Sequence, residues 1–519
     1  MELLKKEIRR NNIGKKAVDQ FYVDDDVNVP DAKSDVARVI LSEGRVKVED
    51  IRMAENYARV TGKILYQILY VTDEAEPRLA SLQGKVPFEE MVYMEDEQRG
   101  QIHMKSCRTE LSVSVIHSRK LNIKAMTELE LGAEWEQEEM VTLDVEGQQE
   151  LYKKFENRNL LKLQTTRKDT YRIKEEIRLS GTKENIGMLL WTNAALRKLD
   201  TRLGKDELQL RGEIQVFCFY ESPEGKMDWI EQSVPYEGRI ECYGSDDTMF
   251  HHLYAELIDE NLDVRMDEDG EMRILGVEAT LEVRVLVYDE ENVQILNDVY
   301  ALREVCRPQI EEMTFESLVM QNHSKCKLTE QLSLPEIKDN ILQICHSNGH
   351  LQVSHTERVA EGIMVEGMLH VLFMYVKADD QIPFDIWQGM VPFTHVIETK
   401  DISAEMNYDI GSELEQLSVG LLGNDAVEVK AVLAFRVFLR QAEPVQNIRS
   451  IAVEPVDMEA AAKVPGIVGY IVKEGDDLWS LAKRYSTTMD GIREVNELGE
   501  GSLKPGDKIL IFKENMSIL

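Results

Sequence analysis

The chain has 519 residues, enough for about three or four separate cores, and its 43% hydrophobic content is typical of ordinary globular packing. Its 95 acidic residues outnumber its 61 basic residues, and the formal net charge of −34 would repel nucleic-acid phosphates and anionic lipid headgroups. The charge therefore argues against nucleic acid as a partner, and we interpret it as a source of solubility in preference to an acidic docking face for a basic partner.

The N-terminal segment MELLKKEIRRNNIGKK contains basic residues but lacks the apolar run of about 7 to 15 residues that a secretory signal requires. No later stretch has the length and hydrophobicity of a transmembrane segment. The six cysteines are widely spaced and form no CxxC pair, which favours reduced thiols over a disulfide framework. We expect the chain to remain in the cytosol of the cell that makes it.

Three similar segments follow one another along the chain. Each begins with a lysine-containing anchor: VPDAKSDV from Val29, LSGTKENI from Leu179 and LPEIKDNI from Leu334. Each continues with a glycine-containing strand: VTGKILYQILYV from Val60, LRGEIQVFCFY from Leu210 and VEGMLHVLFMYV from Val365. The anchor lysine and the strand glycine are 29 residues apart in every copy, and the period between copies is 150 and then 155 residues. Each copy is therefore large enough to be a domain.

Period-2 alternation places the glycine-containing segments on strands of a β-sandwich or barrel. The glycines, Gly62, Gly212 and Gly367, suggest a bulge or a close approach of backbones. The prolines of the downstream VPF, VPY and VPF segments, Pro87, Pro235 and Pro392, predict edge strands or turns. The repeated tyrosines could form a ligand platform, but we favour core tyrosines whose hydroxyls find partners at the rim: Tyr70, Tyr220 and Tyr375.

The connecting stretches GQQELYKKFENRNLLKLQTTRK and IEEMTFESLVMQNHSK show mixed or helical periodicity and lie between copies. We predict a mainly β protein with three tandem sandwich- or barrel-like repeats at residues 1–150, 151–304 and 305–452. The segment VEPVDMEAAAKVPG has no apolar period and predicts a linker at 453–466, before a small final domain at 467–513.

The sequence offers no recognised catalytic template: neither a phosphate-binding loop, a dinucleotide fingerprint, an HExxH helix nor a GxSxG elbow. One cluster could in principle bind a metal: Cys345, His346, His350 and His355. The matching positions of the other two copies carry neither histidine nor cysteine, and the spacing is not a recognised zinc spacing. We therefore predict no enzyme, no cofactor and no metal.

The final segment predicts a strand, two helices and a strand in about 45 residues. A short strand from Tyr470 to Val472 leads into a Gly-Asp turn, and Asp477 can cap a helix with apolar residues at helical spacing: Leu478, Leu481, Ala482 and Tyr485. Thr488 can cap a second short helix, and LKPGDKILI supplies a turn and the closing strand. These residues resemble the LysM module over the whole segment.

The LysM resemblance implies a shallow groove that binds N-acetylglucosamine-containing glycans. Carried over to this sequence, one wall would consist of Gly475, Asp476, Asp477 and Leu478, and the other of Asn496, Glu497, Leu498, Lys504, Pro505 and Gly506. The family usually has threonine where Asp477 stands, so the groove here gains a negative charge. We expect Trp479, on the other side of the helix, to be exposed and to stack on a sugar or a protein partner.

Three strand-rich repeats followed by a LysM also resemble, over nearly the full length, the SPOCS-domain spore-coat proteins, the SipL-like family. This resemblance implies a non-enzymatic adaptor of the mother-cell cytoplasm, located at the forespore surface. Its implied partner is the coat's scaffold ATPase, stage IV sporulation protein A. The alternative function is a peptidoglycan- or N-acetylglucosamine-binding protein of the cell wall or spore cortex, which the lack of a secretory signal disfavours.

Overall fold

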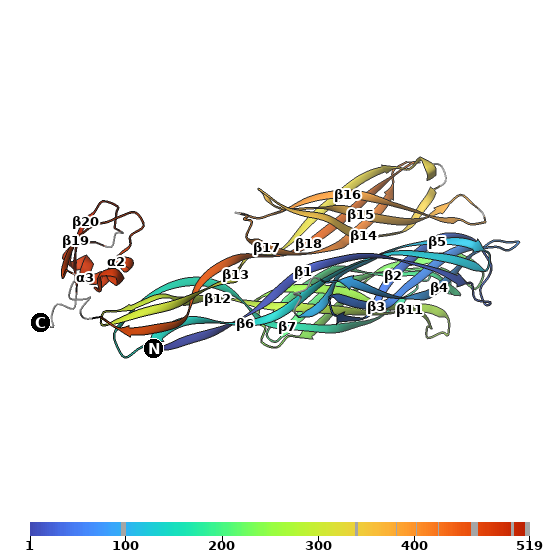
Figure 1. Ribbon diagram of the computed structural model, residues 1–519. Helices are drawn as coiled ribbons and strands as arrows, with labels where there is room; N and C mark the ends of the chain where they lie inside the picture. The colour runs from blue at the N-terminus through green and yellow to red at the C-terminus, as the bar shows by residue number, and fades with distance from the viewer. Residues whose placement is uncertain are drawn as a thin grey trace.

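The computed structural model describes residues 1–94, 100–337, 341–379, 381–400, 402–423, 425–457, 465–499 and 503–513 (Figure 1). Strands dominate these residues, so the predicted mainly β fold is confirmed. Copy 1 contains β1 (Glu2–Asn28), β2 (Val36–Ala54), β3 (Tyr57–Thr72), β4 (Leu79–Tyr93), β5 (Gln101–His117) and β6 (Lys120–Glu146). Copy 2 contains β7 (Leu151–Arg178), β8 (Met188–Gly204), β9 (Glu207–Glu221), β10 (Met227–Glu241), β11 (Phe250–Met266) and β12 (Met272–Ala301).

Copy 3 repeats this order. It contains β13 (Glu304–Ser333), a short 3-10 turn η1 (Pro335–Ile337), β14 (Ile341–Val359), β15 (Gly362–Lys377), β16 (Phe384–Glu398), β17 (Met406–Leu421) and β18 (Ala426–Pro455). Strand β18 therefore includes residues 453–455, which the sequence places in the linker, while 458–464 lie outside the described residues. The terminal module contains β19 (Ile467–Ile471), α2 (Leu478–Tyr485), α3 (Met489–Val495) and β20 (Lys508–Phe512).

Each copy is a sandwich of two antiparallel three-stranded sheets. In copy 1 the sheets have the orders β2-β3-β4 and β1-β6-β5, and copies 2 and 3 have the corresponding sheets. Val60 and Ile64 of β3 belong to the same buried cluster as Leu129 and Leu131 of β6, so the core lies between the two sheets. The prolines of the VPF and VPY segments lie on β4, β10 and β16, which are edge strands as predicted.

The glycine motif and the VPF or VPY motif are cross-strand partners in every copy. The paired residues are Gly62 and Phe88, Gly212 and Tyr236, and Gly367 and Phe393. On the opposite side of each glycine the neighbouring strand has a β-bulge: at Val48/Asp50, Arg197/Asp200 and Val353/His355. The aromatic ring covers the glycine, and both predicted features, a bulge and a close approach, are present.

The repeated tyrosines have a structural role in the first two copies. Tyr70 and Tyr220 are fully buried, and their hydroxyls donate to anchor carbonyls: to Ser34 at 3.0 Å and to Glu184 at 3.2 Å. An arginine from the other sheet also holds each anchor: Arg119 donates to the Lys33 carbonyl at 2.7 Å and Arg273 to the Lys183 carbonyl at 3.0 Å. The lysine motif therefore closes the end of each sandwich, and the preference for core tyrosines is confirmed for Tyr70 and Tyr220.

The connecting stretches between copies, whose periodicity in the sequence is mixed or helical, are the long strands β7 and β13. Unpaired residues at Gln164 and Val319 form bulges that shift the side-chain alternation by one position. Leu161 and Leu163 are buried in one cluster and Leu160 in another, so β7 buries apolar residues on both faces here, a spacing that looks helical in the sequence.

The ends of three strand pairs form a stalk, which we define as residues 2–13 with 134–146, 151–163 with 288–301, and 304–318 with 440–455. Figure 1 shows these pairs extending together away from the three sandwiches. We call the sandwiches, which contain the rest of these strands and all the other strands of the copies, the head. One buried cluster draws residues from all three pairs: Ile8, Val141, Leu160, Val293, Ile295, Phe315 and Val445. Each pair therefore buries its apolar face against the other two.

The head also has a core shared by all three copies. Leu69, Phe219 and Met374 occupy equivalent positions on β3, β9 and β15, and they belong to one buried cluster. Neighbouring copies touch in a ring: β4 contacts β8, His346 of β14 hydrogen-bonds Glu231 of β10 at 3.0 Å, and β16 contacts β2. The chain is thus arranged like a closed trimer made from one polypeptide.

A buried charge network joins copies 1 and 2. The Arg284 guanidinium donates to both carboxylate oxygens of Glu134 at 2.5 and 3.0 Å, and Lys105 pairs with the same carboxylate. Burial alone would raise the pKa of Glu134, but the hydrogen bonds and charges of Arg284 and Lys105 hold it at about 2. A buried charge that loses its partner is strongly destabilising, so this network favours the one relative position of copies 1 and 2 in which the charges meet.

Replacement of Gly367 by alanine should destabilise copy 3. A Cβ there would lie 2.1 Å from the Gln352 carbonyl oxygen and 2.9 Å from the Phe393 ring, so the strands must separate. We expect a loss of about 1–3 kcal/mol in unfolding free energy, measured by urea denaturation. Gly420→Ala is the matched control, since no atom lies within 4 Å of a Cβ at that position. Equal stability of the two variants would contradict the proposed glycine–aromatic packing.

Acidification should loosen the contact between copies 2 and 3 through His252. Its ring packs on Phe438, and burial lowers its pKa to about 4, whereas the usual value is 6.5. The unfolded chain takes up the proton first, so stability should fall as the pH drops from about 6.5 to about 4, by up to about 3 kcal/mol. His252→Gln should flatten this part of the stability–pH curve, while the same change at the exposed His355 should not.

Candidate functional site

The terminal module folds as its sequence predicts. Asp477 caps α2 by accepting from the Ser480 amide at 2.7 Å, and Thr488 caps α3 by accepting from the Gly491 amide at 2.9 Å. Both helices pack against one face of the β19–β20 sheet, around a small core of Leu481, Ala482, Ile492, Ile509 and Ile511. The predicted order of strand, helix, helix and strand is therefore confirmed.

Parts of the two predicted groove walls lie at the same end of the small sheet. The Val472 amide donates to the Asp507 carbonyl at 2.9 Å, and the Gly506 amide donates to the Val472 carbonyl at 2.8 Å. These bonds place the Lys504–Gly506 turn beside the strand that leads into Gly475. Exposed residues are available on both sides: Gly475, Asp477, Glu497, Lys504, Pro505 and Gly506.

Two first-wall carboxylates already have partners within the chain. Asp476 accepts from the Lys473 amide and from the Tyr470 hydroxyl, both at 2.8 Å, and these bonds lower its pKa. Asp477 pairs with Lys154 of β7 at 3.2 Å, in addition to its capping bond. Leu478 packs against the module core. The backbone of this loop therefore offers more to a ligand than its carboxylates do.

Asn496 of the second wall holds the module together. Its amide nitrogen donates to the carbonyls of Ile492 at 2.8 Å and Leu510 at 2.6 Å, and its oxygen accepts from the Leu510 amide at 2.6 Å. Leu498 packs against the module core. Asn496 thus positions β20 and the second wall.

The expectation that Trp479 is exposed is wrong. Its side chain is only 7% exposed, its Nε1 donates to the Asp298 carboxylate at 2.8 Å, and its ring meets the edge of Tyr300 at 4.9 Å between centroids. Both partners lie on β12, in copy 2. Sequence reasoning could not find this contact, because the partners are 181 residues apart and no motif links them.

Sequence reasoning also missed an apolar surface on the module. We define the outer sheet face as the large apolar residues of β19 and β20 that point away from the helices, Ile467, Ile471, Leu510 and Phe512; Gly469 and Lys508 share this side of the sheet. The four apolar residues are between 39% and 58% exposed. The signal was present, because GYIV and KILIF are apolar at consecutive positions, as in strands with two apolar faces.

The histidine–cysteine cluster weighed as a metal site is dispersed. Cys345 donates to the Met374 carbonyl, His346 stacks on Phe217 at 3.7 Å, and His350 stacks on His370 at 4.4 Å. Among the described residues, one other group, His323 with Glu413 and Glu415, has ligand atoms within 4.8 Å of one another. Lys325 and Arg436 already pair with its two carboxylates, so these carboxylates are neutralised within the chain.

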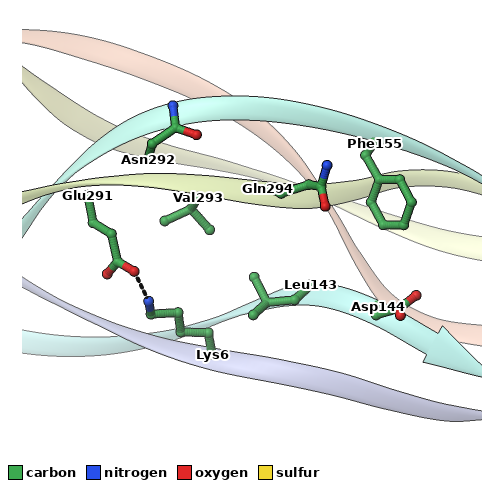
Figure 2. Close-up of a pocket in the computed structure, with 8 residues that line it drawn as sticks. All are labelled: Lys6, Leu143, Asp144, Phe155, Glu291, Asn292, Val293 and Gln294. Atoms are coloured by element: carbon green, nitrogen blue, oxygen red, sulfur yellow. Dashed lines mark hydrogen bonds and ion pairs between the residues drawn. The ribbon is translucent and has the colours of Figure 1, made fainter.

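A shallow hollow of about 290 Å³ lies in the stalk between copies 1 and 2 (Figure 2). Lys6 and Glu291 pair across it, and Phe155, Asn292 and Gln294 line the remainder. The side-chain amide of Asn292 donates to the Asn159 side chain at 2.7 Å, so this amide already has a partner within the chain. We therefore interpret the hollow as a polar contact between the stalk pairs of copies 1 and 2, and not as a ligand site.

Comparisons with known families agree with this architecture. A LysM domain model matches residues 470–512, and a model described as SipL, SPOCS domain matches residues 35–146, 185–267 and 340–422. The chain thus carries three SPOCS regions and a LysM module, domain types that are known for binding and scaffold roles. Because the SPOCS matches cover more than half of the chain, it belongs to the SipL family. No match was found among curated proteins or solved structures.

The two domain types indicate a sporulation-related protein that carries a peptidoglycan-binding type of module. Neither type is a known catalytic domain. Among the described residues, the longest helices fall far short of the length and apolar character needed to cross a membrane.

Replacing Asn496 by alanine should loosen β20. The change removes two hydrogen bonds to the Leu510 backbone, each worth about 1 kcal/mol. We expect about tenfold faster amide hydrogen exchange at Leu510, measured by mass spectrometry on peptides covering 508–512. Glu494→Ala, on the exposed surface of α3, should leave this exchange rate unchanged. Unchanged exchange in both variants would mean that Asn496 does not hold the strand.

Proposed function

We propose that the protein is a non-enzymatic adaptor in endospore coat assembly, which links the coat's scaffold ATPase to the forespore surface from the mother-cell side. The observation that carries this proposal is the outer sheet face of the LysM. Four large apolar side chains lie on one face of a two-stranded sheet, beside Lys508, and each is 39% to 58% exposed among the described residues. Clustered exposed apolar side chains of this kind mark protein-binding surfaces.

The shape of the chain supports a linking role. Figure 1 shows the head strands at one end of the body and the LysM beyond the other end of the stalk. Strand β12 has 30 residues, which corresponds to a span of roughly 90–100 Å. A partner bound to the LysM and a partner bound to the head would therefore be held well apart.

The predicted groove supports a second function, binding of N-acetylglucosamine-containing glycans such as peptidoglycan. Gly475 and the Lys504–Gly506 turn offer exposed backbone on both walls. The Asp477 carboxylate stands where the family usually has a threonine hydroxyl, so one sugar-facing donor is replaced by an acceptor. The adaptor function is the stronger proposal because it uses a surface that is open and apolar.

Leu510→Lys should weaken binding of the purified coat ATPase to the full chain by at least about tenfold, because it places a charge in the centre of the outer sheet face. Isothermal titration calorimetry would measure the change. Val18→Lys is the matched control, since Val18 is also an exposed apolar residue on a strand but lies on copy 1. Unchanged ATPase binding by Leu510→Lys would contradict the proposed surface, and binding of N-acetylglucosamine oligomers alone would favour the glycan function.

A further inference from the structure

The tip of the copy 2 stalk carries a seat for helix α2 of the LysM. We define the seat as Tyr152 and Lys154 of β7 with Asp298 and Tyr300 of β12. The two carboxylate oxygens of Asp298 accept separately from Trp479 Nε1 at 2.8 Å and from Lys483 Nζ at 2.6 Å. Since Trp479 and Lys483 are one helical turn apart, a single carboxylate holds one face of α2.

Aromatic packing completes the seat. Tyr152 stacks on Tyr300 at 5.0 Å, and Tyr300 meets Trp479 edge to face at 4.9 Å. The Tyr300 hydroxyl donates to the Thr487 carbonyl, at the end of α2, at 3.0 Å. Tyr300 is 4% exposed and belongs to the same buried cluster as the LysM core. The contact therefore combines apolar burial with charge-assisted hydrogen bonds, as specific interfaces do.

Only copy 2 has this combination of residues. The stalk pairs share a bulge at equivalent positions, at Leu143, Asn297 and Arg449, which aligns the three tips. The residue that aligns with Tyr300 is Glu146 in copy 1 and Ala452 in copy 3, whereas Asp298 aligns with Asp144 in copy 1 and with Ser450 in copy 3. The repeats diverge where the LysM lies, so the seat is a feature of copy 2 and not of the repeat.

The seat engages one end of the predicted groove and leaves the outer sheet face open. Asp477 of the first wall pairs with Lys154, and Trp479 faces Tyr300 and Asp298. The outer sheet face lies on the other side of the module, since the helices cover the opposite face of β19–β20. A ligand that uses the Asp477–Trp479 end therefore competes with the seat, whereas a protein on the outer sheet face does not.

We propose that the copy 2 tip is an intramolecular docking site that restrains glycan binding by the LysM while leaving it open to a protein partner. This inference rests on one part of the proposed function, namely that the LysM groove binds glycans. An N-acetylglucosamine oligomer reaches the whole groove when the module leaves the seat, so the docked fraction lowers its apparent affinity.

The test uses the full chain labelled with 5-fluorotryptophan, with the Trp479 resonance assigned by Trp479→Phe. Asp298→Lys should move this ¹⁹F resonance and sharpen it, because the freed module tumbles on its own. It should also raise the affinity for N-acetylglucosamine hexamers by about fivefold or more. Asp269→Lys, the same charge change at the exposed β11–β12 turn, is the matched control. Tyr300→Ala should reproduce both effects, and retained amide protection in β20 would show that the LysM remains folded.

An unchanged Trp479 resonance in Asp298→Lys and Tyr300→Ala would overturn the docked state. If the module is freed but its affinity for the hexamer is unchanged, or if no variant binds the hexamer, the proposed competition between the seat and the glycan is overturned. ATPase binding is measured in parallel and should be equal in wild type and Asp298→Lys. If neither the wild type nor any variant binds the ATPase, the adaptor function is overturned, while the result on LysM docking still holds.

Discussion

The body of this protein depends on one constraint: two antiparallel strands alone cannot bury an apolar face. Each copy extends such a pair beyond its sandwich, and the three pairs bury their apolar residues against one another, with Ile8, Leu160 and Phe315 from three different copies in one cluster. A single copy would expose this surface. The need for a common core therefore gives a physical reason why the chain contains three copies, and why they close into a ring.

Around this common core, polar contacts select the correct arrangement. Apolar packing is tolerant of sliding, but the Glu134–Arg284 pair is buried and satisfied only in one register of copies 1 and 2. The bulges at equivalent points of the stalk turn the strands together, and the glycine–aromatic pairs fix the register within each head. Stability and specificity thus come from different residues.

The same separation of roles appears at the LysM. Its core residues make it fold, its loops form the two predicted groove walls, and its outer sheet face supplies apolar area for a protein. The copy 2 tip then decides which of these surfaces is open. The proposed adaptor, with a long stalk between its head and the docked LysM, would hold two partners apart, as the assembly of a layered coat requires.

The sequence by itself determined the local structure: the three-fold repeat, the strands, the edge prolines, the helix caps at Asp477 and Thr488, and the LysM module. These features depend on neighbours in the chain or on short spacings, which a sequence displays directly. Only the tertiary structure decided that β7 and β13 are strands, that the three copies share cores, and that Trp479 is buried on Tyr300. Those outcomes depend on which faces meet between segments more than a hundred residues apart, and the apolar character of a face does not say what will cover it.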